Sequence, residues 1–509
     1  WDGHQPATEP GNPNIMYGQR QQGTLARIDM ITGEVTDVQP QPRDKENYER
    51  FNWDAPILVS PHKPQRLYFG SQRVWKSDNR GDSWQPISGD LTRNQNRFDL
   101  PIMGSKQSWD NAWDVLAMSN YNTISAISES PIKPGLLYVG TDDGYIHISE
   151  NDGKSWRRIE VKKLAGAPSY AYVNDLKADN FNENVVYAVL DNHKYGDFRP
   201  YVYKSTDKGK SWRSISSNIP ERTLTWRIVQ DHVKKDLLFL ATEFGIYFSI
   251  NSGKRWSKIK GGVPTISFRD LAIHKRENDL VGASFGRGFY VFDDMSVFRE
   301  LSNTQMQSPA SLFSVRKAWW YIPRSQLGFG DRPKGTQGDS YFTAKNPPFG
   351  AVFTYYLKSD SKSSLAIRQD KEKALLEDGK SVGFPGWDTV EKERRELKSE
   401  VIFVVSNSKG EIVRRLTAPA KQGFHRIAWD LRYPSPSVIN NSGRQNSMLG
   451  FMAPPGKYSV KMFLNNNGQV SQMSKEQFFD VVPLREGALP TKSHDEIAAF
   501  WRLYENTIK

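Results

Sequence analysis

A short motif occurs four times between residues 77 and 256, and it limits the folds open to this chain more than any other feature. Each copy has the form Ser-x-Asn/Asp-x-Gly-x-x-Trp. The Asn or Asp side chain can hydrogen-bond the backbone two residues on, glycine supplies a positive φ, and tryptophan fills a neighbouring hydrophobic gap. The motif therefore predicts a tight hairpin with a structural role. Its residues are Ser77, Asn79, Gly81 and Trp84; Ser149, Asn151, Gly153 and Trp156; Ser205, Asp207, Gly209 and Trp212; and Ser249, Asn251, Gly253 and Trp256.

Each motif follows short apolar segments that are typical of β-strands. Leu67–Gly70 and Leu137–Gly140 end in glycine shortly before a motif, and Ile57–Pro61 precedes the first of them. An inner strand, two further strands, the hairpin and an outer strand in this order predict the four-stranded blade of a β-propeller. Two weaker units flank the four, from Asn14 to Val35 and from Leu271 to Phe292. We therefore predict a multi-bladed β-propeller with six visible blades, as part of a larger propeller.

The second half of the chain predicts a different β domain. Strand-like segments with alternating apolar residues recur at regular spacing, as expected for an immunoglobulin-like β-sandwich. They are Ala351–Leu357, Val401–Val405, Ile412–Leu416, Gly423–Trp429, Gly456–Phe463 and Gln477–Val482. The whole chain is thus expected to be all-β, with propeller blades over residues 1–300 and the sandwich over residues 349–485.

Three segments differ in composition or periodicity from the predicted strands. Residues 301–348 hold scattered Pro, Gly and Ser, and we expect a linker packed on a neighbouring domain. Residues 361–400 are rich in Lys, Glu and Arg and predict a solvated helical insertion in the sandwich. In residues 486–509 a helical period follows Ser493, which predicts the start of a C-terminal helix behind a serine cap.

Composition narrows the classes of function. Lys plus Arg number 69 and Asp plus Glu 57, which gives a net charge of +12. No basic run, zinc-finger pattern or RNP pattern accompanies this charge, so we expect no nucleic-acid partner. The absence of cysteine excludes disulfides, thiolate metal sites and a cysteine nucleophile. No apolar stretch predicts a transmembrane segment, and a signal peptide is expected upstream of Trp1 or already removed.

Signatures of metals and cofactors are sparse. None of the eight histidines has the His-x-x-x-His spacing of a zinc site. Asp142–Asp143 and Asp293–Asp294 leave two interpretations open, a structural Ca²⁺ site or solvated acidic turns. Gly286-Arg-Gly288 lacks the strand-to-helix setting of a phosphate loop. We therefore expect no cofactor, apart from a structural Ca²⁺ if one of the acidic pairs holds it.

The chain resembles a family of large bacterial secreted proteins with BNR or Asp-box repeats, often called sortilin-like or glycosyl hydrolase. Besides the repeated motif, the resemblance is carried by Asn12–Gly18, Trp53–Ile57, Ser60–Pro64, Gly140–Gly144, Gly286–Asp294, Asn346–Ala351 and Ala428–Arg432. It implies a secreted, periplasmic or cell-surface protein whose remaining blades lie upstream of Trp1. It also implies a wide central tunnel, which in sortilin binds peptides.

Asp boxes also occur in glycoside hydrolases, so the resemblance leaves an enzyme open. The Phe/Tyr-Arg-Ile-Pro motif of sialidases is missing, because Tyr321–Arg324 has a different order. Asp54, Asp175 and Asp270 stand where inner strands begin and would line the propeller axis. They are the candidate catalytic carboxylates, since a glycosidase needs two carboxyl groups across the scissile bond. Salt bridges between adjacent blades are their alternative role.

Arg227 and Arg269 lie beside these aspartates and are candidates for holding the carboxylate of a peptide terminus or an acidic sugar. Trp109, Trp113 and Tyr121 belong to a long excursion over residues 90–121, which would form either a binding rim or a cover on a blade edge. Residues 191–200 make a second excursion from the blade rhythm.

The sequence favours a non-catalytic extracellular or periplasmic scaffold that binds a protein, peptide or polysaccharide on a propeller face. A glycoside hydrolase that uses axial carboxylates is the alternative. A third interpretation is a subunit of an outer-membrane or envelope complex, in which the basic surface meets an anionic partner.

Overall fold

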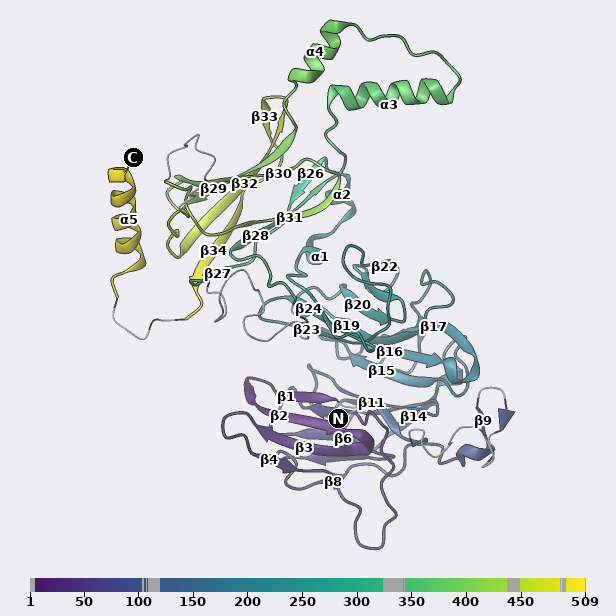
Figure 1. Cartoon of the computed structure of the whole chain (residues 1–509). Coiled ribbons are helices and arrows are strands. Elements are labelled where there is room, and N and C mark those ends of the chain that lie inside the picture. The colour runs from purple at the N-terminus through teal and green to yellow at the C-terminus, as the bar shows by residue number, and fades with distance from the viewer. Residues whose placement is uncertain are drawn as a thin grey trace. The chain divides into compact units, whose positions relative to one another are not determined.

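The computed structural model describes residues 5–102, 105–106, 108, 120–323, 342, 344–436, 449–485, 487 and 491–508. The chain divides into two compact units, Trp1–Arg299 and Glu300–Lys509. Strands dominate both units (Figure 1). Across the described ranges, no helix has the length and apolar character that spanning a bilayer requires.

The described part of the first unit contains six antiparallel sheets in chain order, and each sheet pairs its strands in sequence. Their strands are β1 (Pro6–Glu9), β2 (Asn12–Arg20), β3 (Thr24–Asp29) and β4 (Val35–Asp37); β5 (Ile57–Val59), β6 (Leu67–Gly70), β7 (Val74–Ser77) and β8 (Gln85–Pro86); β11 (Ile124–Glu129), β12 (Leu137–Thr141), β13 (Tyr145–Ser149) and β14 (Arg157–Glu160); β15 (Tyr172–Ala178), β16 (Val186–Asn192), β17 (Asp197–Ser205) and β18 (Arg213–Ser214); β19 (Thr225–Gln230), β20 (Leu238–Thr242), β21 (Gly245–Ser249) and β22 (Ser257–Lys258); and β23 (Phe268–His274), β24 (Asp279–Ser284) and β25 (Phe289–Phe292). A separate hairpin pairs β9 (Pro101–Ile102) with β10 (Ser105–Lys106).

The sheets stack on one another through their middle strands. β6, β12, β16 and β20 are buried at every position, so both faces of each strand are covered. The first strands β5, β11, β15, β19 and β23 each contact the next in chain order. Core clusters accordingly join neighbouring sheets, as where Tyr138 and Leu176 share one cluster. Five of these sheets have four strands and the sixth, β23 to β25, has three. Stacked antiparallel sheets of this kind are propeller blades, so the six predicted blades are confirmed.

The repeated motif forms the turn between the third and fourth strands of four blades. In every copy the serine Oγ accepts a hydrogen bond from the glycine N–H, at 2.8 to 2.9 Å, and the four glycines have φ between +74° and +88°. The indoles of Trp84, Trp156 and Trp256 donate to a carbonyl at the end of the preceding blade. Trp212 instead donates to Gly209 in its own turn. The motif thus closes a hairpin and, in three copies, fastens it to the blade before it.

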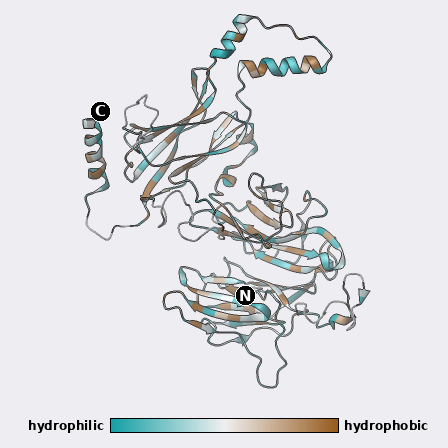
Figure 2. Ribbon diagram, in the orientation of Figure 1, coloured by the Kyte–Doolittle hydropathy of each residue, from teal (hydrophilic) through white to brown (hydrophobic). Residues whose placement is uncertain are grey.

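The second unit is a sandwich of two sheets. One has the strand order β26-β28-β31 and the other β27-β34-β32-β29-β30, with β33 paired to β32. The sheets meet face to face, since the ring of Phe353 lies 5.9 Å from that of Phe403 and 5.7 Å from that of Phe479. Apolar residues concentrate on these strands (Figure 2). The strands are β26 (Ala310–Leu312), β27 (Ala318–Trp320), β28 (Ala351–Leu357), β29 (Glu400–Asn407), β30 (Ile412–Pro419), β31 (Gly423–Trp429), β32 (Gly456–Asn466), β33 (Gln469–Gln472) and β34 (Gln477–Pro483).

Two strands of the sandwich lie in the segment expected to be a linker. β26 pairs antiparallel with β28, whereas β27 pairs parallel with β34. Strands of three residues carry too little alternation to be recognised in the sequence, and the parallel pair departs from the antiparallel sandwich that the alternation indicated. The immunoglobulin-like character of the sandwich stays a prediction.

Helices lie at the margins of the sheets. The insertion in the sandwich contains α3 (Ser364–Glu377) and α4 (Trp387–Arg395), neither of which has a buried residue. An ion pair of 2.8 Å between Arg368 and Glu393 joins them, as expected for a solvated helical insertion. α1 (Val297–Glu300) and α2 (Asn303–Gln307) are short. α5 (His494–Ile508) begins with a capping box, in which Glu496 N–H donates to Ser493 Oγ at 3.2 Å and Ser493 N–H donates to Glu496 Oε2 at 3.0 Å.

Candidate functional site

The first strands of four blades share a β-bulge near their start. The register shifts at Ser125, Asn174, Trp226 and Arg269. Bulges re-aim side chains and are frequent beside binding sites. Asn174 Nδ2, for example, donates to the Thr225 carbonyl of the next blade at 2.9 Å. These strand starts form what we call the inner edge of the propeller, and most candidate residues lie along it.

Arg227, Asp175 and Asp270 form a chain of ion pairs along the inner edge. Arg227 Nη1 lies 3.5 Å from Asp175 Oδ1, and its Nε lies 3.6 Å from Asp270 Oδ1. Arg227 also donates to the Asn174 carbonyl at 2.8 Å, and Asp175 Oδ2 accepts from the Ile228 N–H at 3.0 Å. The three charged residues belong to β15, β19 and β23, so the chain links three successive blades. This is the arrangement expected of salt bridges between adjacent blades.

Arg269 differs from Arg227 in making no ion pair with a described residue. Its guanidinium carbon lies 3.8 Å from the centre of the Trp226 ring and 6.0 Å from that of Phe285. Within the described ranges its side chain makes no hydrogen bond either. Burial by its neighbours lowers the pKa of Arg269, although the residue remains exposed at the surface. The Trp226 ring therefore holds an arginine whose hydrogen-bond donors contact no group of the part of the chain that the structure describes.

Asp54 lies at the same edge, just before β5. Its backbone N–H donates to Asn52 Oδ1 at 3.1 Å, and its carboxylate is exposed. The charge of Asp54 acts on Arg227, Arg269 and Tyr172, so all three candidate aspartates share one electrostatic environment.

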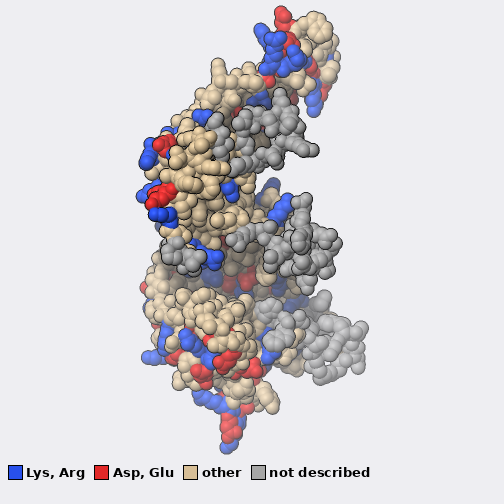
Figure 3. Space-filling view, turned by 60° about the vertical axis from the view of Figure 1, so that its left-hand side comes forward, with Lys and Arg blue, Asp and Glu red and all other residues tan. Residues whose placement is uncertain are grey.

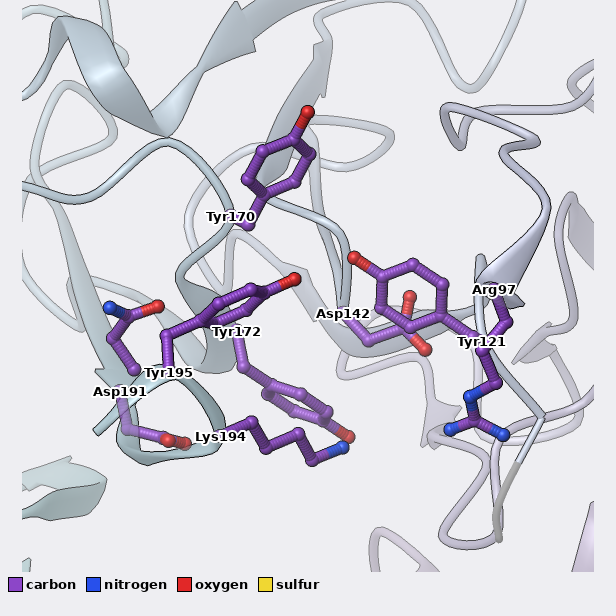
Figure 4. A pocket seen from close by; sticks show the side chains of 9 residues that line it. Arg97, Tyr121, Asp142, Tyr170, Tyr172, Asp191, Lys194 and Tyr195 are labelled. Carbon is purple, nitrogen blue, oxygen red and sulfur yellow. The ribbon is translucent and has the colours of Figure 1, made fainter. Parts of the chain in front are cut away.

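A small pocket opens beside this cluster (Figure 4). Its volume is about 20 Å³, and it is lined by Arg97, Tyr121, Asp142, Tyr170, Tyr172, Asp191, Asn192, Lys194 and Tyr195. A space of this size holds one or two waters or a single small group, and it is too small for a sugar ring. Tyr121 is therefore part of a pocket wall. Trp109 and Trp113, the other two aromatic candidates of that excursion, lie outside the described residues.

Asp142 is the most strongly perturbed acid of the pocket. Burial, reinforced by the charge of Asp143, raises the pKa of Asp142 to about 7. Its carboxylate oxygens accept hydrogen bonds from the Thr123 N–H at 2.9 Å and the Thr123 hydroxyl at 2.7 Å. A large fraction of Asp142 is therefore protonated at neutral pH, which is the state a carboxylic acid needs to donate a proton or a hydrogen bond.

The acidic pairs considered for Ca²⁺ have protein partners in this structure. Asp143 accepts from the Thr141 hydroxyl at 2.5 Å and from the Arg93 N–H at 2.7 Å. Asp294 accepts from the hydroxyl and the N–H of Ser296. Over the described ranges, no three His, Asp or Glu side chains gather as a metal-binding group would require. A structural Ca²⁺ at either pair stays a prediction.

The pocket also contains residues that sequence reasoning missed. Tyr172 starts β15, Asp191 and Asn192 end β16, and Lys194 lies in the 3₁₀ turn η5 (His193–Tyr195). None belongs to a motif, and the one available signal was the excursion at residues 191–200. Asp142 was noticed only as half of an acidic pair, because sequence does not reveal burial.

On the face shown in Figure 3, basic and acidic side chains are intermixed. The net charge of +12 therefore forms no continuous basic surface on that face.

The chain is a β-propeller protein with a β-sandwich. Charged side chains from successive blades meet at the inner edge of the propeller, and the sandwich follows as a second β domain. No family model matches it, and no curated protein matches its sequence. Among solved structures it is similar to the extracellular domain of a hybrid two-component system from B. thetaiotaomicron, with 11% identity, a TM-score of 0.39 and coverage of 94% of this chain and 49% of that one.

Two further structures show the same level of similarity. A GH74 xyloglucanase from Xanthomonas campestris has 12% identity and a TM-score of 0.42, with 96% of this chain and 74% of that one covered. YCF48 from Cyanidioschyzon merolae has 9% identity and a TM-score of 0.35, with 55% of this chain and 79% of that one covered. The chain thus spans about half the length of the first of these structures. The propeller architecture follows from the sheets of this chain itself.

Proposed function

We propose that this chain is a binding scaffold of the cell surface or periplasm that holds a protein, peptide or polysaccharide ligand at the inner edge of its propeller. The observation that carries this proposal is Arg269, an exposed arginine stacked on Trp226 without an internal partner. Stacking restricts the guanidinium to one orientation, so less side-chain entropy is lost when a ligand binds. The turn geometry of the repeated motif also supports the BNR/Asp-box, sortilin-like assignment proposed from the sequence.

The ligand group that fits Arg269 best is a carboxylate. A guanidinium presents paired N–H donors that match the two oxygens of a carboxylate, and an aromatic plate beside it suits the apolar part of a peptide or the face of a sugar. Arg227 has a different role, because its donors already contact Asp175, Asp270 and the Asn174 carbonyl. We therefore assign ligand contact to Arg269 and positioning of the inner strands to Arg227.

The test compares the wild-type chain with Arg269→Ala and with Arg287→Ala, which removes another exposed arginine of the same blade. Thermophoresis would measure binding of peptides with free or amidated C-termini, oligogalacturonate and neutral xyloglucan oligosaccharides. We expect carboxylate-bearing probes to bind the wild type and Arg287→Ala equally, and Arg269→Ala at least tenfold more weakly. Equal binding of these probes by Arg269→Ala, or no binding of any probe by the wild type, would count against the proposal.

A glycoside hydrolase remains the second candidate because of one observation. Asp175 and Asp270 contact one guanidinium, so their carboxyl groups lie within roughly 10 Å, the range found in inverting glycosidases. Against this, Arg227 lies between the two carboxylates, where the sugar would have to lie. Mass spectrometry of xyloglucan and polygalacturonate after incubation separates the two functions: shortened products that disappear in Asp175→Asn or Asp270→Asn would establish the enzyme.

A further inference from the structure

The pocket beside the inner edge contains two cations that make no direct ion pair with a described residue. Arg97 comes from the 3₁₀ turn η2 (Arg97–Asp99) and Lys194 from η5. Across the described ranges, neither side chain makes a hydrogen bond or an ion pair. Burial lowers the pKa of both groups, which is the expected consequence of placing a cation among apolar and aromatic neighbours.

Polar atoms without partners point to the same place. Arg97 Nε and Asn192 Oδ1 are buried and make no hydrogen bond with any described residue, whereas the Tyr121 hydroxyl interacts with Tyr195. Asn192 is only 8% exposed, and both Arg97 and Asn192 line the pocket. Buried polar groups in folded proteins are nearly always paired, so two unpaired ones around one space indicate that a polar ligand completes the site.

The two carboxylates of the pocket act on its cations only at a distance, because their direct contacts are with other groups. Asp191 accepts a hydrogen bond from the His193 N–H at 3.2 Å, and its Oδ1 contacts His193 Nδ1. Asp142 is engaged by Thr123. Neither carboxylate lies within ion-pair distance of Arg97 or Lys194. Figure 4 shows the Lys194 ammonium beside the ring of Tyr172, whose centre lies 5.3 Å from Nζ.

We propose that this pocket binds one small anionic group, either a free monovalent anion such as chloride or a carboxylate at the end of a ligand, between Arg97 and Lys194. The volume of about 20 Å³ admits such a group and nothing much larger. The Arg97 and Lys194 N–H groups supply donors. The Asn192 amide supplies a further donor when it is turned over, since its oxygen and nitrogen occupy equivalent positions.

The walls of the pocket strengthen this attraction. The Arg97 guanidinium lies 5.9 Å from the centre of the Tyr121 ring, and Tyr170 stacks on Tyr195 with ring centres 6.1 Å apart. Aromatic walls exclude water, so the charges act across a lower dielectric than at an open surface. The anion would connect the segment before β9 with the connection between β16 and β17. This site does not depend on the ligand contact proposed for Arg269.

The experiment measures ³⁵Cl NMR line broadening by the full chain at constant ionic strength, with sulfate, a larger divalent anion, as the replacement. We expect a saturable broadening in the wild type that formate removes by competition. The double variant Arg97→Met/Lys194→Met should lose at least 90% of it. Lys163→Met, which removes an exposed lysine near the same blade, should keep it.

Two further arms identify the source of the anion and guard against misfolding. A peptide with a free C-terminus that displaces chloride, when its amidated form does not, would assign the site to the end of a ligand; displacement by formate alone would assign it to a free anion. Arg97→Lys and Lys194→Arg keep the charge and should retain part of the broadening even if the methionine variant is unstable. Absence of saturable broadening in the wild type, or its persistence in a folded double variant, would overturn the site.

Discussion

At the scale of single residues, burial perturbs ionisable groups in and next to the pocket beside the inner edge. Asp142, Asp143 and Lys194 each have a pKa displaced in the direction of the neutral form, and burial is the largest cause in each case. Such groups cost stability unless they are paired. Perturbed acids and bases cluster at functional sites more often than elsewhere, which is why this edge is the place to test for function.

The pKa of Asp142 has a consequence for stability. Because its pKa is raised in the folded chain, the folded state keeps this proton while the unfolded chain loses it between pH 4 and pH 7. The stabilisation of the folded state by protonated Asp142 is fully present below about pH 4. It is lost as pH rises to about 7, and the free energy of unfolding falls by at most about 1.4 kcal/mol per pH unit. Asp142→Asn keeps an acceptor for the Thr123 N–H and cannot titrate. In urea unfolding, the free energy of unfolding of Asp142→Asn should therefore increase relative to that of the wild type from pH 4.5 to pH 7.5. If the two free energies change with pH in parallel, the raised pKa of Asp142 is wrong.

The glycine of the repeated motif is required both by its conformation and by its neighbour. Gly153 has φ +84°, and a Cβ there would lie 2.6 Å from Ile87 Cδ1 of the preceding blade. Gly11 has a similar φ of +78° with no atom within 4 Å of the added Cβ. We expect Gly153→Ala to cost about 3 kcal/mol in chemical unfolding and Gly11→Ala about 1 kcal/mol, since only the first adds overpacking to backbone strain. Equal costs would mean that the contact with Ile87 contributes nothing.

At the scale of elements, the blades are joined by side chains that cross from one first strand to the next. Removing Arg227 leaves the buried Asp175 without its cation, and a stranded buried charge is far more costly than a lost surface pair. Asp270 is 61% exposed, so its ion pair with Arg227 contributes little to the free energy of unfolding. Arg227→Met should therefore lower the free energy of unfolding by about 3 kcal/mol.

A double-mutant cycle distinguishes the ion pair from simple truncation. Asp175→Asn keeps an acceptor for the Ile228 N–H, so adding it to Arg227→Met should recover part of the loss. Arg269→Met is the control, because that arginine has no ion pair, and its cost should stay below about 1 kcal/mol. If the cycle shows no coupling energy between Asp175 and Arg227, their ion pair does not contribute to stability.

The helical insertion should be dispensable for the sandwich. α3 and α4 bury no residue, and the ion pair between Arg368 and Glu393 connects them only to each other. Replacing residues 363–396 by a flexible Gly/Ser linker costs only loop-closure entropy, which changes slowly with length. Calorimetry should show the Tm of the sandwich moving by no more than about 2 °C. A drop larger than about 10 °C would show that the insertion supports the sheets.

How far the sequence predicts this molecule depends on how local each signal is. The Ser and Gly positions of the motif form their hydrogen bond within the turn itself, so the turn and the six blades could be read directly. β27 has three residues and pairs with β34, more than 160 positions away, which no local pattern records. The pocket combines Arg97, Asp142 and Lys194 from three separate connections, so its composition depends on how the blades stack.

At the scale of the whole molecule, each unit has a core of its own. Phe239 is fully buried in the propeller blades, and Phe403 is fully buried between the two sheets of the sandwich. Blades that contact mainly their neighbours propagate stability along the chain, whereas a sandwich gains it from one central cluster. The two units should therefore respond separately to damage in either core.

Two matched substitutions test this independence. Phe239→Ala and Phe403→Ala each remove a fully buried ring, and each should cost about 3 to 5 kcal/mol in the unit that contains it. If the units unfold separately, scanning calorimetry resolves two transitions, with Phe239→Ala lowering the Tm of one and Phe403→Ala that of the other. The pH dependence carried by Asp142 should then appear only in the transition that Phe239→Ala moves, because that acid lies in the same unit. Both transitions shifting together in either variant would mean that the propeller and the sandwich form one cooperative structure.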